Sequence, residues 1–342
     1  MTTTHPRLRP PPLPEPRGPL SAAVTAALRA GHPPPGPPPP PPGHCPAYGD
    51  DLQLALYLLY EVHYQGFEDV PDRLEWDGAL LTLRAAIEDR FLAALRADVP
   101  VQSTDTAEQA LDALQTEPVG DDGTGVSHFL RDEGTADQLR EYAAVRSLYH
   151  LKEADPHAWV IPRLWGRAKA AMVAVEYDEF GAGRPENIHA DLYAALMADL
   201  GLETAYGHYV DAALAEALAV VNLMSLFGLH RSLRAALIGH FAAVEITSSP
   251  VSRRLAGALR RTGAGPDAVR FYTEHVEADA VHEQVVRHDV VAGLLEHEPG
   301  LAADVVFGVR TTTHLETRLA SRLLNAWRGG DTALRSEGER TE

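Results

Sequence analysis

Histidine and acidic residues recur at helical spacing in the last third of the chain. His275, Asp279 and His282 stand at positions i, i+4 and i+7 of one apolar segment. At 100° per residue these positions span about 60°, so two imidazoles and one carboxylate project from one face of a helix. Such a face can ligate a metal ion. A chance polar stripe on an exposed helix would give the same pattern.

Two further patterns supply ligand types that helical metal sites use. Glu186 and His189 are i, i+3 neighbours directly after Pro185, which suits a first helical turn. Glu-x-x-His is the pair that di-iron and di-manganese bundles take from each of two helices. An acidic residue near a helix start is also common, because it stabilises the helix dipole. Glu153 ends a largely apolar helix, where an inward carboxylate requires a partner or a metal.

In chain order, a carboxylate, a Glu-x-x-His pair and a His-x-x-x-Asp-x-x-His run lie on three successive helical blocks. This order resembles the heme-oxygenase-like diiron oxidases, also known as iron-containing redox enzymes, over about residues 136–327. The resemblance implies that two Fe(II) ions bind Glu153, Glu186, His189, His275, Asp279 and His282. Some members add a carboxylate before the second helix, and Glu179, seven residues ahead of Glu186, has that place.

The resemblance also implies a reaction. Members of the family use O₂ as co-substrate and form a peroxo-type diiron intermediate. They oxidise small amines, amino-acid-derived compounds or carboxylic acids by N-oxygenation, desaturation or oxidative C–C cleavage. The ligand chemistry agrees, because imidazoles and carboxylates without thiolates suit iron or manganese. With Glu179 included, the carboxylates balance the charge of two Fe(II) ions.

Two alternative functions stay open on the residues alone. A heme-binding, heme-oxygenase-like protein needs one proximal histidine near the start of the first helix, and it leaves six further ligands unexplained. A metal-free helical interaction protein would use the proline-rich N-terminal segment as a scaffold. The leading prediction is therefore a non-heme diiron oxidoreductase with a small-molecule substrate. An external electron donor and assembly into a homodimer are both compatible with this prediction.

The segments that must position these residues are predicted to be helices. Apolar residues recur at helical spacing from about residue 50 to residue 327. No window alternates with the period of two that a half-buried β-strand shows. Turn-forming residues predict breaks at 155–156, 181–185, 201, 248–250 and 263–266. The sequence thus predicts an all-α fold, a heme-oxygenase-like helical bundle.

Composition divides the chain into four segments. Prolines crowd residues 1–46, where they fix φ and remove backbone donors. We therefore expect a disordered Pro-rich leader, which a short helix over about residues 20–30 could interrupt. The other three segments are expected to be accessory helices packed on the core (47–130), the diiron domain (131–330) and a disordered tail (331–342).

Charge and cysteine content exclude several classes of partner. The net charge of −18 argues against nucleic acid and anionic membrane surfaces, which recruit clustered Lys and Arg. The longest apolar stretch, 212–229, is interrupted by Glu216 and Asn222 and predicts a buried core helix, not a membrane span. Cys45 is the only cysteine and cannot form an intrachain disulfide. These features predict a cytoplasmic protein.

Other polar residues have both a structural and a functional interpretation. Glu245, on an apolar helix, could line the substrate pocket or be buried with a local hydrogen bond. Arg310 and Glu316 could form a buried ion pair or bind a substrate carboxylate. Seven histidines lack partners at matching spacing and are expected to be caps or surface residues: His157, His208, His230, His240, His288, His297 and His314.

Overall fold

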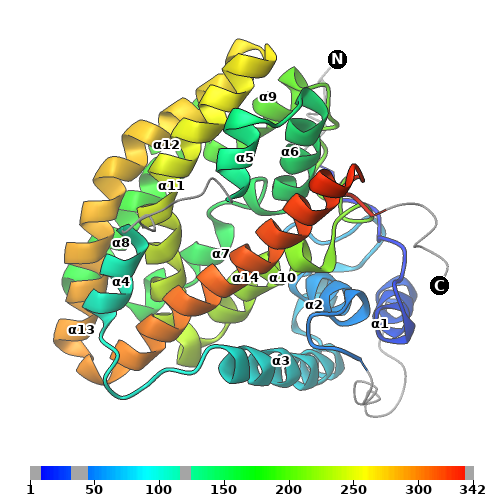
Figure 1. Ribbon diagram of the computed structural model, residues 1–342. Coiled ribbons are helices and arrows are strands. Elements are labelled where there is room, and N and C mark those ends of the chain that lie inside the picture. Colours follow the sequence, from blue (N-terminus) through cyan, green and yellow to red (C-terminus); the bar gives the residue numbers. More distant parts are fainter. Residues whose placement is uncertain (1–8, 32–44, 116–124, 336–342) are drawn as a thin grey trace.

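A computed structural model describes residues 9–31, 45–115 and 125–335 (Figure 1). Every regular element in these ranges is a helix, which confirms the all-α prediction. The helices are α1 (Pro19–Ala30), α2 (Asp50–Glu61), α3 (Gly78–Asp98), α4 (Ala107–Gln115), α5 (Val126–Asp132), α6 (Ala136–His150), α7 (Asp155–Ala158), α8 (Gly166–Glu179), α9 (His189–Asp199), α10 (Ala215–Leu229), α11 (Arg234–Thr262), α12 (Pro266–Val285), α13 (Ala292–His297) and α14 (Ala302–Gly329).

Local sequence signals account for several helix ends. The Asp77 side chain accepts hydrogen bonds from the first backbone N–H groups of α3. Thr135 and Gln138 form a reciprocal capping box at the start of α6. Gly263, in the left-handed region at φ +80°, ends α11. Most of the expected breaks are therefore confirmed as helix boundaries.

The core forms where α10, α11, α12 and α14 pack together. As predicted, α10 is apolar nearly all round and buried. The long helix α11 packs along both α12 and α14 (Figure 1). Gly239 of α11 and Gly308 of α14 permit this close approach, since a Cβ on either would collide with a backbone carbonyl of the facing helix.

The expected break at 248–250 is wrong. α11 continues through Pro250 for a total of 29 residues. A proline removes one hydrogen bond inside a helix and costs about 3 kcal/mol. Packing of α11 on α12 and α14 along its length outweighs that local cost.

The expectation of a disordered leader is wrong for residues 9–31. The short helix considered within the leader forms as α1 and packs on α2. Leu20, Val24 and Leu28 lie one turn apart and are all buried. Asp51 of α2 accepts hydrogen bonds from backbone N–H groups at the start of α1. The prolines flank this apolar stripe and do not interrupt it. Residues 1–8 and 32–44 lie outside the described part of the chain.

The C-terminal tail also packs on the fold as far as it is described. The backbone N–H of Ala333 donates to Glu141, and that of Arg335 donates to the carbonyl oxygen of Ala212. The expectation of disorder is therefore wrong for residues 331–335, and residues 336–342 lie outside the described range. No described helix is both long and apolar enough to span a bilayer.

Candidate metal centre

Four helices and the turn after α6 bring acidic and imidazole side chains together in the interior. One group contains Glu153, Glu179, His189 and His275, whose ligand atoms all lie within 4.8 Å of one another. A second group contains Glu179, Glu245 and His282 within the same limit. Glu179 belongs to both groups. The described residues thus offer two adjacent positions for a metal ion, with one carboxylate between them.

The first group is assembled from chain segments that end or begin at the site. Glu153 lies on the turn between α6 and α7, Glu179 is the last residue of α8, and His189 is the first residue of α9. The Nδ1 atom of His189 is 2.6 Å from Oε2 of Glu179. Oε2 of Glu153 lies 2.9 Å from Nδ1 of His150, one turn back along the chain. Burial lowers the pKa of His150, which favours its neutral form.

The His275 ring has the orientation of a metal ligand. Its Nδ1 atom is 2.7 Å from the carbonyl oxygen of Phe271. A carbonyl only accepts, so Nδ1 carries the proton and Nε2 keeps its lone pair. Nε2 is buried and has no hydrogen-bond partner. Ligating histidines in proteins are commonly fixed in this way, with the other ring nitrogen donating to a carbonyl.

In the second group, the His282 ring lies between three carboxylates. Its Nδ1 atom lies 3.2 Å from Oε2 of Glu245 and 3.6 Å from Oε1 of Glu179, and its Nε2 atom lies 3.2 Å from Asp178. Burial acts to lower the pKa of His282, but the hydrogen bond to Glu245 and the neighbouring carboxylates raise it to about 9. A proton on His282 is thus a counter-charge that a metal ion would replace.

The interior around both groups carries more acid than base. Glu176 lies one turn before Glu179 on α8, is 2 % exposed, and has no hydrogen-bond partner for either oxygen. Burial, then the Glu179 and Glu245 carboxylates, raise its pKa well above the usual range. Several buried carboxylates facing imidazoles in one place fit a site for cations, because hard oxygen and imidazole donors suit iron or manganese.

The structure brings together five of the seven predicted ligands and separates one. Glu153, Glu179, His189, His275 and His282 converge. Glu186 is exposed on a short 3₁₀ turn, because α9 begins only at His189. The expectation that Glu186 and His189 share a helix face is therefore wrong. Asp279 lies on α12, but its side chain is outside the described residues.

Glycines explain why Glu179, and not Glu186, meets His189. Gly181 and Gly183 both have φ near +80°. At Gly181 a Cβ would lie only 2.8 Å from the backbone nitrogen of Ile188, so the chain folds back tightly on itself. This turn places the end of α8 beside the start of α9.

Sequence reasoning missed several buried groups near the centre. His150 and Glu176 were not singled out, although each lies one helical turn from a predicted ligand. Glu245 is buried beside His282, so its interpretation as a pocket-lining or locally bonded residue did not place it at the second position. His157 and His240 are buried with their ring centroids 5.3 Å apart, which contradicts their assignment as caps or surface residues.

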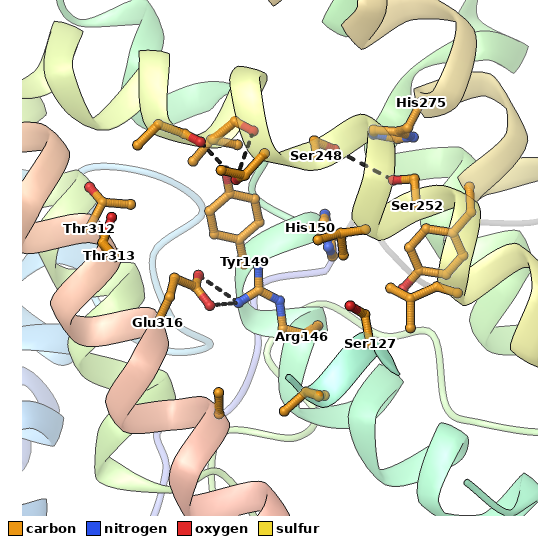
Figure 2. Close-up of a pocket in the computed structure, with 18 of the residues that line it drawn as sticks. Ser127, Arg146, Tyr149, His150, Ser248, Ser252, His275, Thr312, Thr313 and Glu316 are labelled. Carbon is orange, nitrogen blue, oxygen red and sulfur yellow. Dashed lines mark hydrogen bonds and ion pairs between the residues drawn. The ribbon is translucent and has the colours of Figure 1, made fainter. Parts of the chain in front are cut away.

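A cavity of about 460 Å³ opens beside the first group (Figure 2). His150, Glu153 and His275 line it together with Arg146 and Tyr149. At the cavity wall, Nη1 of Arg146 lies 2.8 and 3.0 Å from the two carboxylate oxygens of Glu316. The Nε atom of Arg146 and the hydroxyl of Tyr149 are buried without hydrogen-bond partners. The cavity wall thus carries a guanidinium N–H without a hydrogen-bond partner as well as metal-ligand candidates.

The contacts bear on two expectations about this wall. Arg310 and Glu316 do not pair with each other, because Arg310 binds Asp105 while Glu316 binds Arg146. The helices α4 and α5, from the segment expected to be accessory, contribute Leu114, Val126 and Ser127 to the cavity wall.

Comparison with known proteins agrees with this geometry. Residues 140–317 match the family described as iron-containing redox enzymes. Nitrosourea synthase from Streptomyces achromogenes subsp. streptozoticus is 26% identical over 236 residues, which cover 66% of this chain. The chain spans about half, 49%, of that relative's own length.

The family match contains every residue of the two ligand groups. It also extends over more than half of the chain. The chain therefore belongs to the iron-containing redox enzymes and is an oxidoreductase.

Proposed function

We propose that this oxidoreductase holds two iron ions side by side and uses O₂ to oxidise a small substrate bound in the adjoining cavity. The observation that carries the proposal is the pair of ligand groups that share Glu179. A carboxylate common to two neighbouring positions is suited to bridge two ions. A single structural metal would need only one group, closed by its ligands.

In this proposal, one ion is held by Glu153, His189 and His275, the other by Glu245 and His282, and Glu179 contacts both. Asp279 is included because it stands between His275 and His282 on α12. Glu186 is included as a ligand that reaches the centre only after the turn before α9 rearranges. When bound, ferrous iron supplies the electrons that O₂ needs, and an external donor restores them.

The residues that line the cavity determine which substrates can bind beside the metal centre. The cavity of about 460 Å³ ends at His150, Glu153 and His275, so a bound molecule has one end beside the metal centre. Arg146 lies one turn before His150 on α6 and retains a free Nε donor. Arginine recognises carboxylates through paired N–H groups. Among small amines, amino-acid-derived compounds and carboxylic acids, this favours a substrate with a carboxylate.

The name of the relative favours one of the possible reactions. Nitrosourea synthase is named for a product in which nitrogen is bonded to oxygen. This supports N-oxygenation as the outcome, ahead of desaturation or C–C cleavage. Glu316, which binds Arg146 at the cavity wall, would also pair with the ammonium group of an amino-acid-derived substrate.

An anaerobic Fe(II) titration of the purified chain, followed by exposure to O₂, tests the proposal. We expect two iron ions per chain, and a change in visible absorbance when O₂ is admitted. One iron per chain would contradict the proposal. A Soret band on addition of heme would favour the heme-binding alternative, and absence of any metal from protein purified without chelator would favour an interaction protein.

A further inference from the structure

A buried ion pair lies directly behind the metal centre, outside its ligand groups. Nζ of Lys152 is 2.5 Å from Oε2 of Glu61, and the two side chains are 1% and 0% exposed. The rings of Tyr57, Tyr64 and Tyr206 surround the ammonium group, with centroids 4.4–6.0 Å from Nζ. The Tyr206 hydroxyl donates to the same Glu61 oxygen over 3.0 Å. Both charges are therefore fully enclosed and paired.

The stability of the fold does not require such a buried ion pair. Desolvation of two ions offsets their mutual attraction, and apolar residues of similar volume often serve a core equally well. A buried pair does, however, fix the relative position of the two segments that carry it, because separating them exposes two uncompensated charges to an apolar interior. The segments joined here are α2, through Glu61, and the turn after α6, through Lys152.

That turn carries Glu153, the residue next to Lys152. No helix fixes Glu153, because α6 ends at His150 and α7 begins at Asp155. The backbone of Lys152 is held on both sides, by its N–H to Tyr149 and by its carbonyl to Asp155. The two neighbouring side chains then diverge: Lys152 reaches Glu61, while Glu153 reaches His150 and the first ligand group.

We propose that Glu61 is a positioning residue for the metal centre: through Lys152 it fixes the turn that presents Glu153 to the iron. α2 lies outside residues 140–317, the part of the chain that matches the family. The proposal therefore gives the N-terminal helices a role in metal binding. It rests on Glu153 being a ligand, as stated in the proposed function.

The test compares two buried carboxylates of the N-terminal helices. In the double variant E61Q/K152M both charges are removed together, Gln still accepts from Tyr206, and no unpaired ion is left. The matched control is Glu88→Gln on α3, where a buried carboxylate pairs with His230 and Arg84 and does not contact the Glu153 turn. Each full-length variant is titrated anaerobically with Fe(II), and then with Co(II), whose d–d absorption reports ligand number and geometry.

We expect E61Q/K152M to bind Fe(II) about tenfold more weakly, as for other residues that orient a ligand, and to alter the Co(II) bands. Glu88→Gln is expected to keep both at wild-type values. Wild-type affinity and spectrum in E61Q/K152M would overturn the proposal, and so would a failure of that variant to fold, which would assign the pair to stability. Glu153→Ala separates the two proposals, since unchanged metal binding there contradicts the ligand assignment itself.

Discussion

The interior of this protein holds two ionic clusters of opposite character. At the Glu61–Lys152 pair, one cation meets one carboxylate inside a cage of tyrosines. At the metal centre, by contrast, the carboxylates of Glu153, Glu176, Glu179 and Glu245 are gathered with imidazoles. The first cluster is complete as the protein folds. Under the proposed function, the second is completed by metal cations.

Protons take the place of those cations in the metal-free chain. A carboxylate network raises the pKa of His282 to about 9, against the effect of burial. Burial, together with the neighbouring carboxylates, raises the pKa of Glu176 well above its usual range. His282 must lose a proton, or move, before it can ligate a metal. The two clusters therefore differ in charge balance. The Glu61–Lys152 pair is neutral and suited to position a segment, whereas the carboxylate-rich cluster is suited to bind cations that perform chemistry.

The largest effect is expected from Glu179→Ala. Because this carboxylate belongs to both ligand groups, its removal should reduce bound iron from two ions per chain to fewer than one and abolish the oxidation. Metal analysis after anaerobic loading measures this. Glu88→Gln, which alters a buried carboxylate away from the centre, should keep two. Two tightly bound iron ions in Glu179→Ala would show that Glu179 does not join the positions.

Helix α1 should show the opposite behaviour when its apolar contacts are removed, with a loss of stability and no loss of metal. Leu28 of α1 is fully buried, so Leu28→Ala should lower the free energy of unfolding by about 2–5 kcal/mol. Chemical denaturation measures the loss, and iron content at 20 °C should stay at the wild-type value. An unchanged unfolding curve would show that α1 does not pack on α2 in solution.

An intermediate effect is expected at the cavity. Arg146→Gln should weaken binding of a carboxylate-bearing ligand by about tenfold to a hundredfold, because a charge-assisted hydrogen bond is lost. Calorimetry with the amino acid or carboxylic acid that best protects the wild type against heat measures the change. Arg310→Gln is the matched control, since Arg310 pairs with Asp105 outside the cavity. Equal losses in both variants would remove Arg146 from substrate recognition.

The sequence predicted those residues of the centre that a single helix positions, and it missed those that other helices bring in. His275 and His282 followed from the period of one helix, and that period holds wherever the helix packs. Glu245 and Glu176 come from other helices, and their approach depends on tertiary packing that no spacing shows. The predicted helix face shared by Glu186 and His189 was wrong for a local reason, because the left-handed glycines 181 and 183 turn the chain before Glu186. The all-α fold was predictable throughout, whereas the packing of α1 was not.

The smallest effect is expected from Glu186→Gln in the metal-free protein. Glu186 is exposed, so its substitution should change the free energy of unfolding by less than about 0.5 kcal/mol. If the turn before α9 rearranges on metal binding, the same variant should bind one of its two iron ions more weakly. Thermal unfolding with and without Fe(II) checks both. A large destabilisation without metal would mean that Glu186 is already engaged.

The sharing of Glu179 by two iron ions is tested most directly by spectroscopy of the loaded chain. Wild-type protein is loaded anaerobically with ⁵⁷Fe(II), and Mössbauer spectra are recorded with integer-spin electron paramagnetic resonance. Two high-spin ferrous ions in equal amounts, with the low-field signal of a coupled pair that disappears in Glu179→Ala, are the predicted result. Two magnetically isolated ions, or a single one, would contradict the shared carboxylate.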